Sequence, residues 1–228
     1  MAYLIGIDIG TSGTKTVLFN EKGEALSQSV FEYGMKQLKP GWAEQSPEDW
    51  WKAVCTTVPD VLNKEGITKE EISGIGLSGQ MHGLVMLDKD GRVIRDSIIW
   101  CDSRSVKECQ EITEKVTFAK LMDITCNPAL TGFTASKLLW VRNNEPWNYE
   151  KTKKILLPKD YIRYKLTGEF ATEVSDASGM QFLDVPKRCW SREILDLLDV
   201  DPGLLADVYE SYLVTGRVSK EAAALTGL

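Results

Sequence analysis

The chain has 228 residues, of which 43% are apolar, so it is long enough to bury the core of one large domain. A formal net charge of −6 argues against nucleic acid as a partner. The sequence contains no run of about eighteen apolar residues, so no membrane-spanning helix is expected. The N-terminal residues lack a signal pattern. The five cysteines are odd in number and lack C-x-x-C spacing, which argues against a disulfide framework. A single histidine excludes a multi-histidine metal site. We therefore expect a cytoplasmic protein with reduced thiols.

The predicted elements begin with three strands in a meander. Residues 3–9, 15–20 and 25–33 have the composition of strands. The polar segment 20–23 ends in glycine and predicts the turn between the second strand and the third. Residues 10–14, which are rich in glycine and hydroxyl side chains, form the first turn of this meander.

A helix is expected to begin at Pro47, because Ser46 suits the cap and proline suits the first helical position. Pro59 lies inside this helix and predicts a kink or an early end. Further short strands are expected at 72–77, 84–87, 98–100 and 155–157. Helices are expected at 103–122, 134–144, 159–166, 190–198 and 219–226, with an irregular polar stretch at 171–184. A strand meander followed by alternating helices and strands indicates a mixed α/β sheet domain.

The end of the first strand carries the most informative side chain, Asp8. We expect this carboxylate to be buried in its apolar strand, where an unpaired charge is costly and calls for a reason. Glycines in the following turn let backbone N–H groups approach an anion closely. A carboxylate beside such a turn suits Mg²⁺ and phosphate oxygens. The alternative is a tight hairpin with an incidental aspartate, and these residues alone do not decide between the two.

Four segments carry longer motifs: the hairpin 8–15, the W-x-D-x-R segment 100–104, the segment 132–144 with a hydroxyl residue before K-x-x-W, and the segment 157–168. Together these segments resemble the FGGY family of carbohydrate kinases, in the actin-like ATPase superfamily. The resemblance covers nearly the whole chain. It implies an α/β domain of the actin-like, ribonuclease H-like type, with a mixed β-sheet flanked by helices.

The resemblance also implies roles for particular residues. Asp8 would organise Mg²⁺, through water, and face the γ-phosphate of ATP. The hairpin would hold the phosphates through Gly10, Thr11, Ser12, Gly13, Thr14 and Lys15. The sugar would contact Gln80, Met81, His82, Trp100, Asp102 and Arg104. Lys15 equally suits a solvated strand edge.

Some of these side chains have structural interpretations that stay open. Met81 and Trp100 suit ordinary packing as well as a sugar face. His82 suits a core histidine bonded to a carbonyl, although a neutral imidazole can also donate to or accept from a sugar hydroxyl. Asp102 and Arg104 follow a strand end, where loops commonly build sites, but they could pair with each other.

Within the family, the segment 78–83 is most similar to the xylulose kinases, in which a Met-His pair contacts the sugar. The resemblance therefore implies ATP-dependent phosphorylation of the terminal hydroxyl of a ketopentose, D-xylulose first, with gluconate or ribulose as alternatives. A non-catalytic sugar-binding module derived from a kinase is a second class, but it would not need Asp8. An actin-like or chaperone-like nucleotide switch is a third class, and it would not explain the segment 132–144.

Residues 1–228 would form the N-terminal domain of such a kinase. The chain stops at Leu228 in what resembles an interior turn, so we expect a fragment that is inactive alone. A C-terminal nucleotide-binding domain, with the aspartate that accepts the hydroxyl proton, is expected outside it. The implied partners are ATP, Mg²⁺, a small sugar and that second domain, without nucleic acid or membrane. Dimers are common among relatives, so a homodimer is left open.

Overall fold

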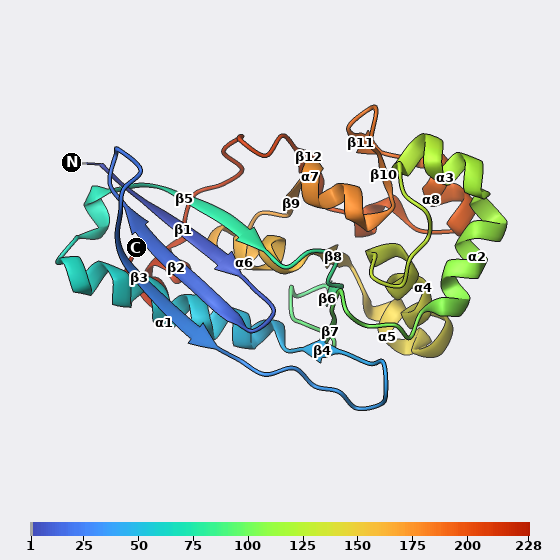
Figure 1. The fold of residues 1–228 in the computed structure, drawn as a ribbon, viewed down its shortest axis with the longest axis horizontal. Coiled ribbons are helices and arrows are strands. Elements are labelled where there is room, and N and C mark those ends of the chain that lie inside the picture. Colours follow the sequence, from blue (N-terminus) through green and yellow to red (C-terminus); the bar gives the residue numbers. More distant parts are fainter. Residues whose placement is uncertain (1) are drawn as a thin grey trace.

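The structure is a computed structural model that describes residues 2–228, and a four-stranded sheet forms its N-terminal layer (Figure 1). The strand order is β3-β2-β1-β5, with antiparallel pairing among the first three and β5 parallel to β1. These strands are β1 (Tyr3–Ile9), β2 (Gly13–Phe19), β3 (Ala25–Glu32) and β5 (Ile72–Gly79). The predicted meander and the mixed sheet are confirmed.

The remaining strands are short and pair outside this sheet. They are β4 (Glu44–Gln45), β6 (Val85–Leu87), β7 (Ser97–Ile98), β8 (Lys154–Leu156), β9 (Ala171–Glu173), β10 (Leu183–Asp184), β11 (Cys189–Trp190) and β12 (Asp207–Tyr209). The α-helices are α1 (Pro47–Glu65), α2 (Val106–Val116), α3 (Phe118–Thr125), α4 (Thr134–Asn144), α5 (Pro146–Lys151), α6 (Pro158–Thr167), α7 (Val174–Ala177), α8 (Arg192–Leu198) and α9 (Lys220–Thr226). Among residues 2–228, none of the helices combines the length and the apolar character that crossing a membrane demands.

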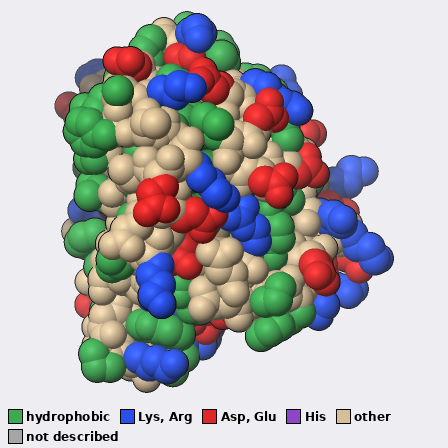
Figure 2. Space-filling model, turned by 90° about the vertical axis from the view of Figure 1, so that its right-hand side faces the viewer, with side chains coloured by type: hydrophobic (Ala, Val, Ile, Leu, Met, Phe, Trp, Pro, Cys, Tyr) green, Lys and Arg blue, Asp and Glu red, His purple; other side chains and the backbone are tan. Residues whose placement is uncertain are grey.

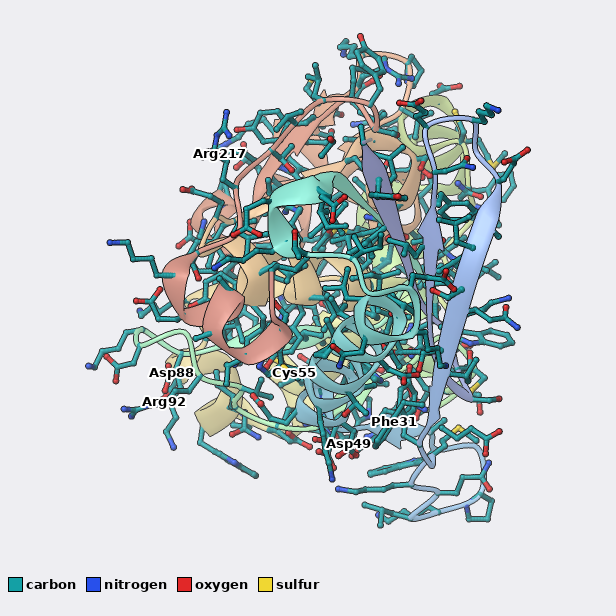
Figure 3. All side chains as sticks on the ribbon, turned by 90° about the vertical axis from the view of Figure 1, so that its left-hand side faces the viewer. Phe31, Asp49, Cys55, Asp88, Arg92 and Arg217 are labelled. Atoms are coloured by element: carbon teal, nitrogen blue, oxygen red, sulfur yellow. The ribbon has the colours of Figure 1, made fainter. Side chains whose placement is uncertain are left out.

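The two faces of the sheet differ, and this difference places Asp8. Alternation along β1 turns its isoleucines toward α1 and α6, where they join one apolar core. Figure 3, in which Phe31 marks β3 and Cys55 marks α1, shows the helices standing on one side of the strands. Leu4 and Asp8 point to the opposite face and are exposed. The expectation of a buried Asp8 is therefore wrong, because the period of two residues puts it opposite the isoleucines.

Two expected helices differ in detail. The helix α1 does not end at Pro59 but continues to Glu65 and stops at Gly66, whose φ of 63° suits glycine. The helix expected at 103–122 is two helices, because Thr117 adopts φ 75° between them and its side chain accepts from the N–H of Lys120. Its start is also later than expected, at Val106, and the backbone N–H of Ser103 donates to the carbonyl of Gly41.

The stretch 171–184 is regular, against expectation. The strand β9 pairs in parallel with β12, from more than thirty residues further along the chain. The side chain of Glu173 then accepts from the N–H groups of Ser175 and Asp176 and caps α7. Long-range pairing of β9 with β12 is invisible to local sequence patterns, which explains the wrong expectation.

A second apolar core lies among α2, α3, α4 and α8. Figure 2 shows the outer face of this part of the molecule, on which acidic and basic side chains are interspersed. Exposed ion pairs such as Lys120–Glu193 and Arg192–Asp196 belong to these helices. All five cysteines are free, as expected. Leu84, which follows the Met81–His82 turn in the sequence, belongs to this core.

Candidate active site

The turn between β1 and β2 presents free backbone donors. The N–H of Gly10 donates to the carbonyl of Gly13 at 3.0 Å and closes the turn. A Cβ at Gly13 would lie 2.7 Å from the carbonyl oxygen of Phe31, so this position requires glycine. The N–H groups of Thr11 and Ser12 have no acceptor in the part of the chain that the structure describes. Two free amides on a tight turn are the donors that a phosphate group requires.

Asp8 stands next to this turn on the open face of the sheet. The strand register places it between Lys15 of β2 and Ser78 of β5, and all three residues are exposed. Its carboxylate makes no hydrogen bond or ion pair within residues 2–228. The described residues contain no group of three or more potential metal ligands. A lone free carboxylate fits Mg²⁺, which proteins commonly hold by one or two carboxylates, waters and the phosphates of a substrate.

Thr14 takes a different place from the other turn residues. It is fully buried, and its hydroxyl lies 3.2 Å from the hydroxyl of Tyr33. Tyr33 in turn donates to the carbonyl oxygen of Gly10 at 2.7 Å, and burial raises the pKa of Tyr33 to about 12, so the phenol keeps its proton. The side chain of Thr14 therefore supports the turn from inside, while Thr11 and Ser12 face outward.

The second turn follows β5 and carries Met81 and His82. Met81 is 51% exposed, whereas His82 adopts φ 63° and packs edge-on against Phe133 with ring centroids 4.7 Å apart. A Cβ at Gly179 would lie 2.0 Å from the His82 ring, so this contact requires glycine. A left-handed backbone at a non-glycine residue is a strained conformation that often marks a functional position. Burial lowers the pKa of His82 to about 4, and nearby Lys137 acts in the same direction.

We expect the His82 imidazole to titrate near pH 4 in the folded chain, well below the value of about 6.5 for an unperturbed histidine. The unfolded chain then binds this proton at higher pH than the folded chain, so this group makes stability fall as the pH drops from 6.5 toward 4. Because the sequence has one histidine, its NMR signals are unambiguous. The urea-unfolded chain is the control. A folded-state midpoint at or above pH 6 would contradict this placement of His82.

Trp100 contacts the phosphate turn from the surface. Its indole Nε1 donates to the hydroxyl of Thr11 at 3.0 Å, and the side chain remains 42% exposed. It therefore touches the phosphate turn directly and keeps a free ring face.

The side chains of Asp102 and Arg104 are buried and bind each other. Three nitrogens of the guanidinium serve two carboxylates, with Nε and Nη2 on Asp102 at 2.7–3.0 Å and Nη1 on Glu44 at 2.6 Å. The guanidinium carbon lies 3.7 Å from the Trp42 ring centroid and 4.8 Å from that of Trp140. The side chains of Asp102 and Arg104 are each 1% exposed. This geometry matches the mutual pairing left open above and does not place either side chain within reach of a sugar.

Two contributors to the site were missed by sequence reasoning. Gln45 is 2% exposed and lies at the centre of a hydrogen-bond network under both turns. Tyr33 lies below the phosphate turn. In the sequence, Gln45 is only a polar residue just before Ser46, the cap of α1. That position does not reveal its hydrogen-bond partners, which lie in four other segments. The structure thus brings together Asp8, the free amides and the Met81–His82 turn at one end of the sheet.

This geometry defines an actin-like ATPase domain, in which a strand–turn–strand unit with one free carboxylate stands beside the end of a parallel strand. The profile of the FGGY family of carbohydrate kinases, N-terminal domain, matches residues 3–228. The chain therefore belongs to the FGGY family of carbohydrate kinases and has the fold of its N-terminal domain.

Individual relatives are similar over the full chain. A curated xylulose kinase of Bacillus subtilis (strain 168) is 40% identical over 228 residues, covering 100% of this chain and 46% of the relative. The crystal structure of a xyloylose kinase from Brucella ovis matches with TM-score 0.90 and 37% identity, over 96% of this chain and 46% of that one. The crystal structure of a gluconate kinase from Lactobacillus acidophilus matches with TM-score 0.92 and 28% identity, over 100% of this chain and 46% of that one. The chain thus spans about half the length of these relatives.

Proposed function

We propose that this chain forms the sugar-binding wall and the first phosphate-binding turn of an ATP-dependent sugar kinase. The observation that carries the proposal is the unpartnered carboxylate of Asp8 beside the free amides of Thr11 and Ser12. The strands β1 and β5 are parallel neighbours, so the turns that follow them lie at the same edge of the sheet. Crevices outside the carboxyl ends of parallel strands are the usual ligand sites of open α/β sheets.

Phosphoryl transfer depends mainly on alignment and charge neutralisation. A Mg²⁺ ion, when bound with the nucleotide, neutralises charge on the phosphate oxygens. Asp8 would hold this ion, and the amides of Thr11 and Ser12 would donate to phosphate oxygens. Met81 supplies an apolar surface for the carbon side of a sugar, and the neutral imidazole of His82 can donate to or accept from a hydroxyl. The base that accepts the hydroxyl proton is proposed to lie outside this chain.

The proposed substrate is a ketopentose, most specifically D-xylulose, which would become D-xylulose 5-phosphate. The support is the similarity of the whole chain to xylulose kinases, together with the Met81–His82 turn. Gluconate and ribulose are the alternative substrates, because a gluconate kinase shares the fold. A phosphorylated sugar is charged and does not leave through a membrane, which suits a cytoplasmic enzyme.

A second domain is the proposed partner of this chain. A groove of about 730 Å³ follows the free edge of β5. Tyr212 and Val214 line it and are 82% and 90% exposed, which is unusual for side chains of their size. Coverage of this groove by the C-terminal nucleotide-binding domain of the same kinase would remove that apolar surface from water. We refer to this chain joined to such a domain as the two-domain protein.

The proposal predicts sugar-dependent ATP consumption by the two-domain protein and none by the 228-residue chain alone. The measurement is a coupled spectrophotometric assay with D-xylulose, ribulose and gluconate. D-xylulose should give the highest kcat/KM. Robust turnover by the isolated chain would show that the base lies within it. Sugar binding without turnover in the two-domain protein would favour the non-catalytic module.

A further inference from the structure

Two buried glutamines lie beneath the candidate site and are bonded to each other. Gln80, at the end of β5, is 7% exposed, and Gln45, in β4, is 2% exposed. The Nε2 of Gln80 donates to the Oε1 of Gln45 at 2.8 Å. It also approaches the carbonyl oxygen of Gly10 at 3.4 Å, so the pair touches the phosphate turn.

The amide of Gln45 can adopt only one orientation in this environment. Its Nε2 lies 2.7 Å from the carbonyl oxygen of Thr11 and 3.2 Å from that of Gly34, and both of these can only accept. Its Oε1 lies 3.3 Å from the indole Nε1 of Trp50, which can only donate. Exchange of the oxygen and the nitrogen would set like groups against each other at all three positions. The hydrogen-bond partners of Gln45 therefore fix the orientation of its side-chain amide.

This orientation dictates the orientation of Gln80. Because Gln45 offers Gln80 an acceptor, Gln80 must use its NH₂ group there, and its own Oε1 points elsewhere. That oxygen is buried and has no hydrogen-bond partner within residues 2–228. A buried acceptor without a donor is destabilising, so a hydroxyl that reaches this oxygen gains a full hydrogen bond.

We propose that Gln45 is a positioning residue that makes Gln80 present a hydrogen-bond acceptor to a hydroxyl group of the sugar. This inference rests on the proposed function and deepens it. The same amide of Gln45 also holds the carbonyl of Thr11, so one side chain sets the acceptor for the sugar and the backbone of the phosphate turn. A ligand that lacks a hydroxyl at this place leaves the Oε1 of Gln80 unpaired and is rejected.

The first test needs no ligand and no variant. In the 228-residue chain, the side-chain NH₂ protons of Gln80 should exchange with solvent much more slowly than those of Gln28, which is exposed on β3. NMR of the ¹⁵N-labelled chain measures both. Equal exchange rates for Gln80 and Gln28 would overturn the inference, whatever the enzyme proves to phosphorylate.

The second test compares two replacements of Gln45. Gln45→Glu keeps an acceptor for Gln80 and Trp50 but removes the donors to Thr11, so the protection of Gln80 should persist. Gln45→Met removes the acceptor as well, so protection should be lost. In the two-domain protein, Gln45→Met should lower kcat/KM for D-xylulose about ten- to a hundredfold, as expected for one lost hydrogen bond in a buried site.

Thr57→Val is the matched control. Thr57 is fully buried in α1, and its hydroxyl lies 2.7 Å from that of Thr16, away from both turns. Loss of the Thr57 hydroxyl should destabilise the fold. It should change neither kcat/KM nor the protection of the Gln80 side-chain NH₂ protons from exchange. If Gln45→Met and Thr57→Val lower kcat/KM equally, Gln45 has only a structural role and the inference fails. If the wild-type two-domain protein phosphorylates none of the sugars, the proposed function fails, while the exchange data still decide whether Gln45 orients Gln80.

Discussion

Replacement of Asp8 by asparagine is expected to lower kcat of the two-domain protein by about two to three orders of magnitude, with little change in stability. The replacement keeps the shape of the side chain but removes the negative charge that would hold Mg²⁺ at the phosphates, and loss of one such preorganised electrostatic contact has about this effect. Asp8 is exposed and unpartnered within residues 2–228, so the free energy of unfolding should change by less than about 0.5 kcal/mol.

The assay for this variant is steady-state turnover with D-xylulose and MgATP, accompanied by a thermal unfolding curve. Asp123→Asn is the matched control, because Asp123 is also an exposed aspartate but lies on α3, in the helical part of the molecule. It should behave as the wild type in both measurements. Turnover by Asp8→Asn within a few-fold of the wild type would remove Asp8 from the chemistry.

Replacement of Arg104 by alanine should have the largest effect on stability, a loss of about 3–5 kcal/mol in the free energy of unfolding. The guanidinium is 1% exposed and serves the carboxylates of Asp102 and Glu44 while it stacks on Trp42. Its removal leaves the buried carboxylate of Asp102 without a cation, while Glu44 keeps only its ion pair with Arg95. Because the Asp102 and Arg104 side chains are each 1% exposed, the variant should lose stability first, and activity only through unfolding.

Urea unfolding of the 228-residue chain measures this effect through the transition midpoint and slope. Lys120→Ala is the control, because Lys120 and Glu193 form an ion pair whose side chains are 49% and 51% exposed. Such a surface pair contributes little, so the control should lose less than about 1 kcal/mol. A loss below 1 kcal/mol for Arg104→Ala would show that the buried cluster does not hold the loop that follows β7.

Local patterns were sufficient for much of the fold. The meander followed from strand-like runs separated by glycine turns, and the expected helix at 134–144 is α4 with the same bounds. The start of α1 followed from a proline at the first helical position. In each case, the signal lies within a few residues of the element that it defines.

Features that depend on distant residues could not be predicted. The alternation along β1 puts Asp8 on the face opposite its isoleucines, but the packing of α1 and α6 on the isoleucine face involves residues far from this strand in sequence. The buried pairing of Arg104 depends on Glu44 and on a stacking contact with Trp42. Gln45 likewise takes its orientation from Trp50 and from backbone carbonyls of two other segments. Motif spacing identified the two turns but not the buried groups that hold them.

The central claim is that the first strand and its turn receive the phosphates of a metal-bound nucleotide, next to a sugar held at the second turn. A crystal structure of the two-domain protein with an ATP analogue, Mg²⁺ and D-xylulose tests it most directly. We predict the carboxylate of Asp8 facing the hydrated ion, with the amides of Thr11 and Ser12 on phosphate oxygens. A nucleotide bound elsewhere, with Asp8 facing only solvent and no sugar beside Met81 and His82, would contradict it.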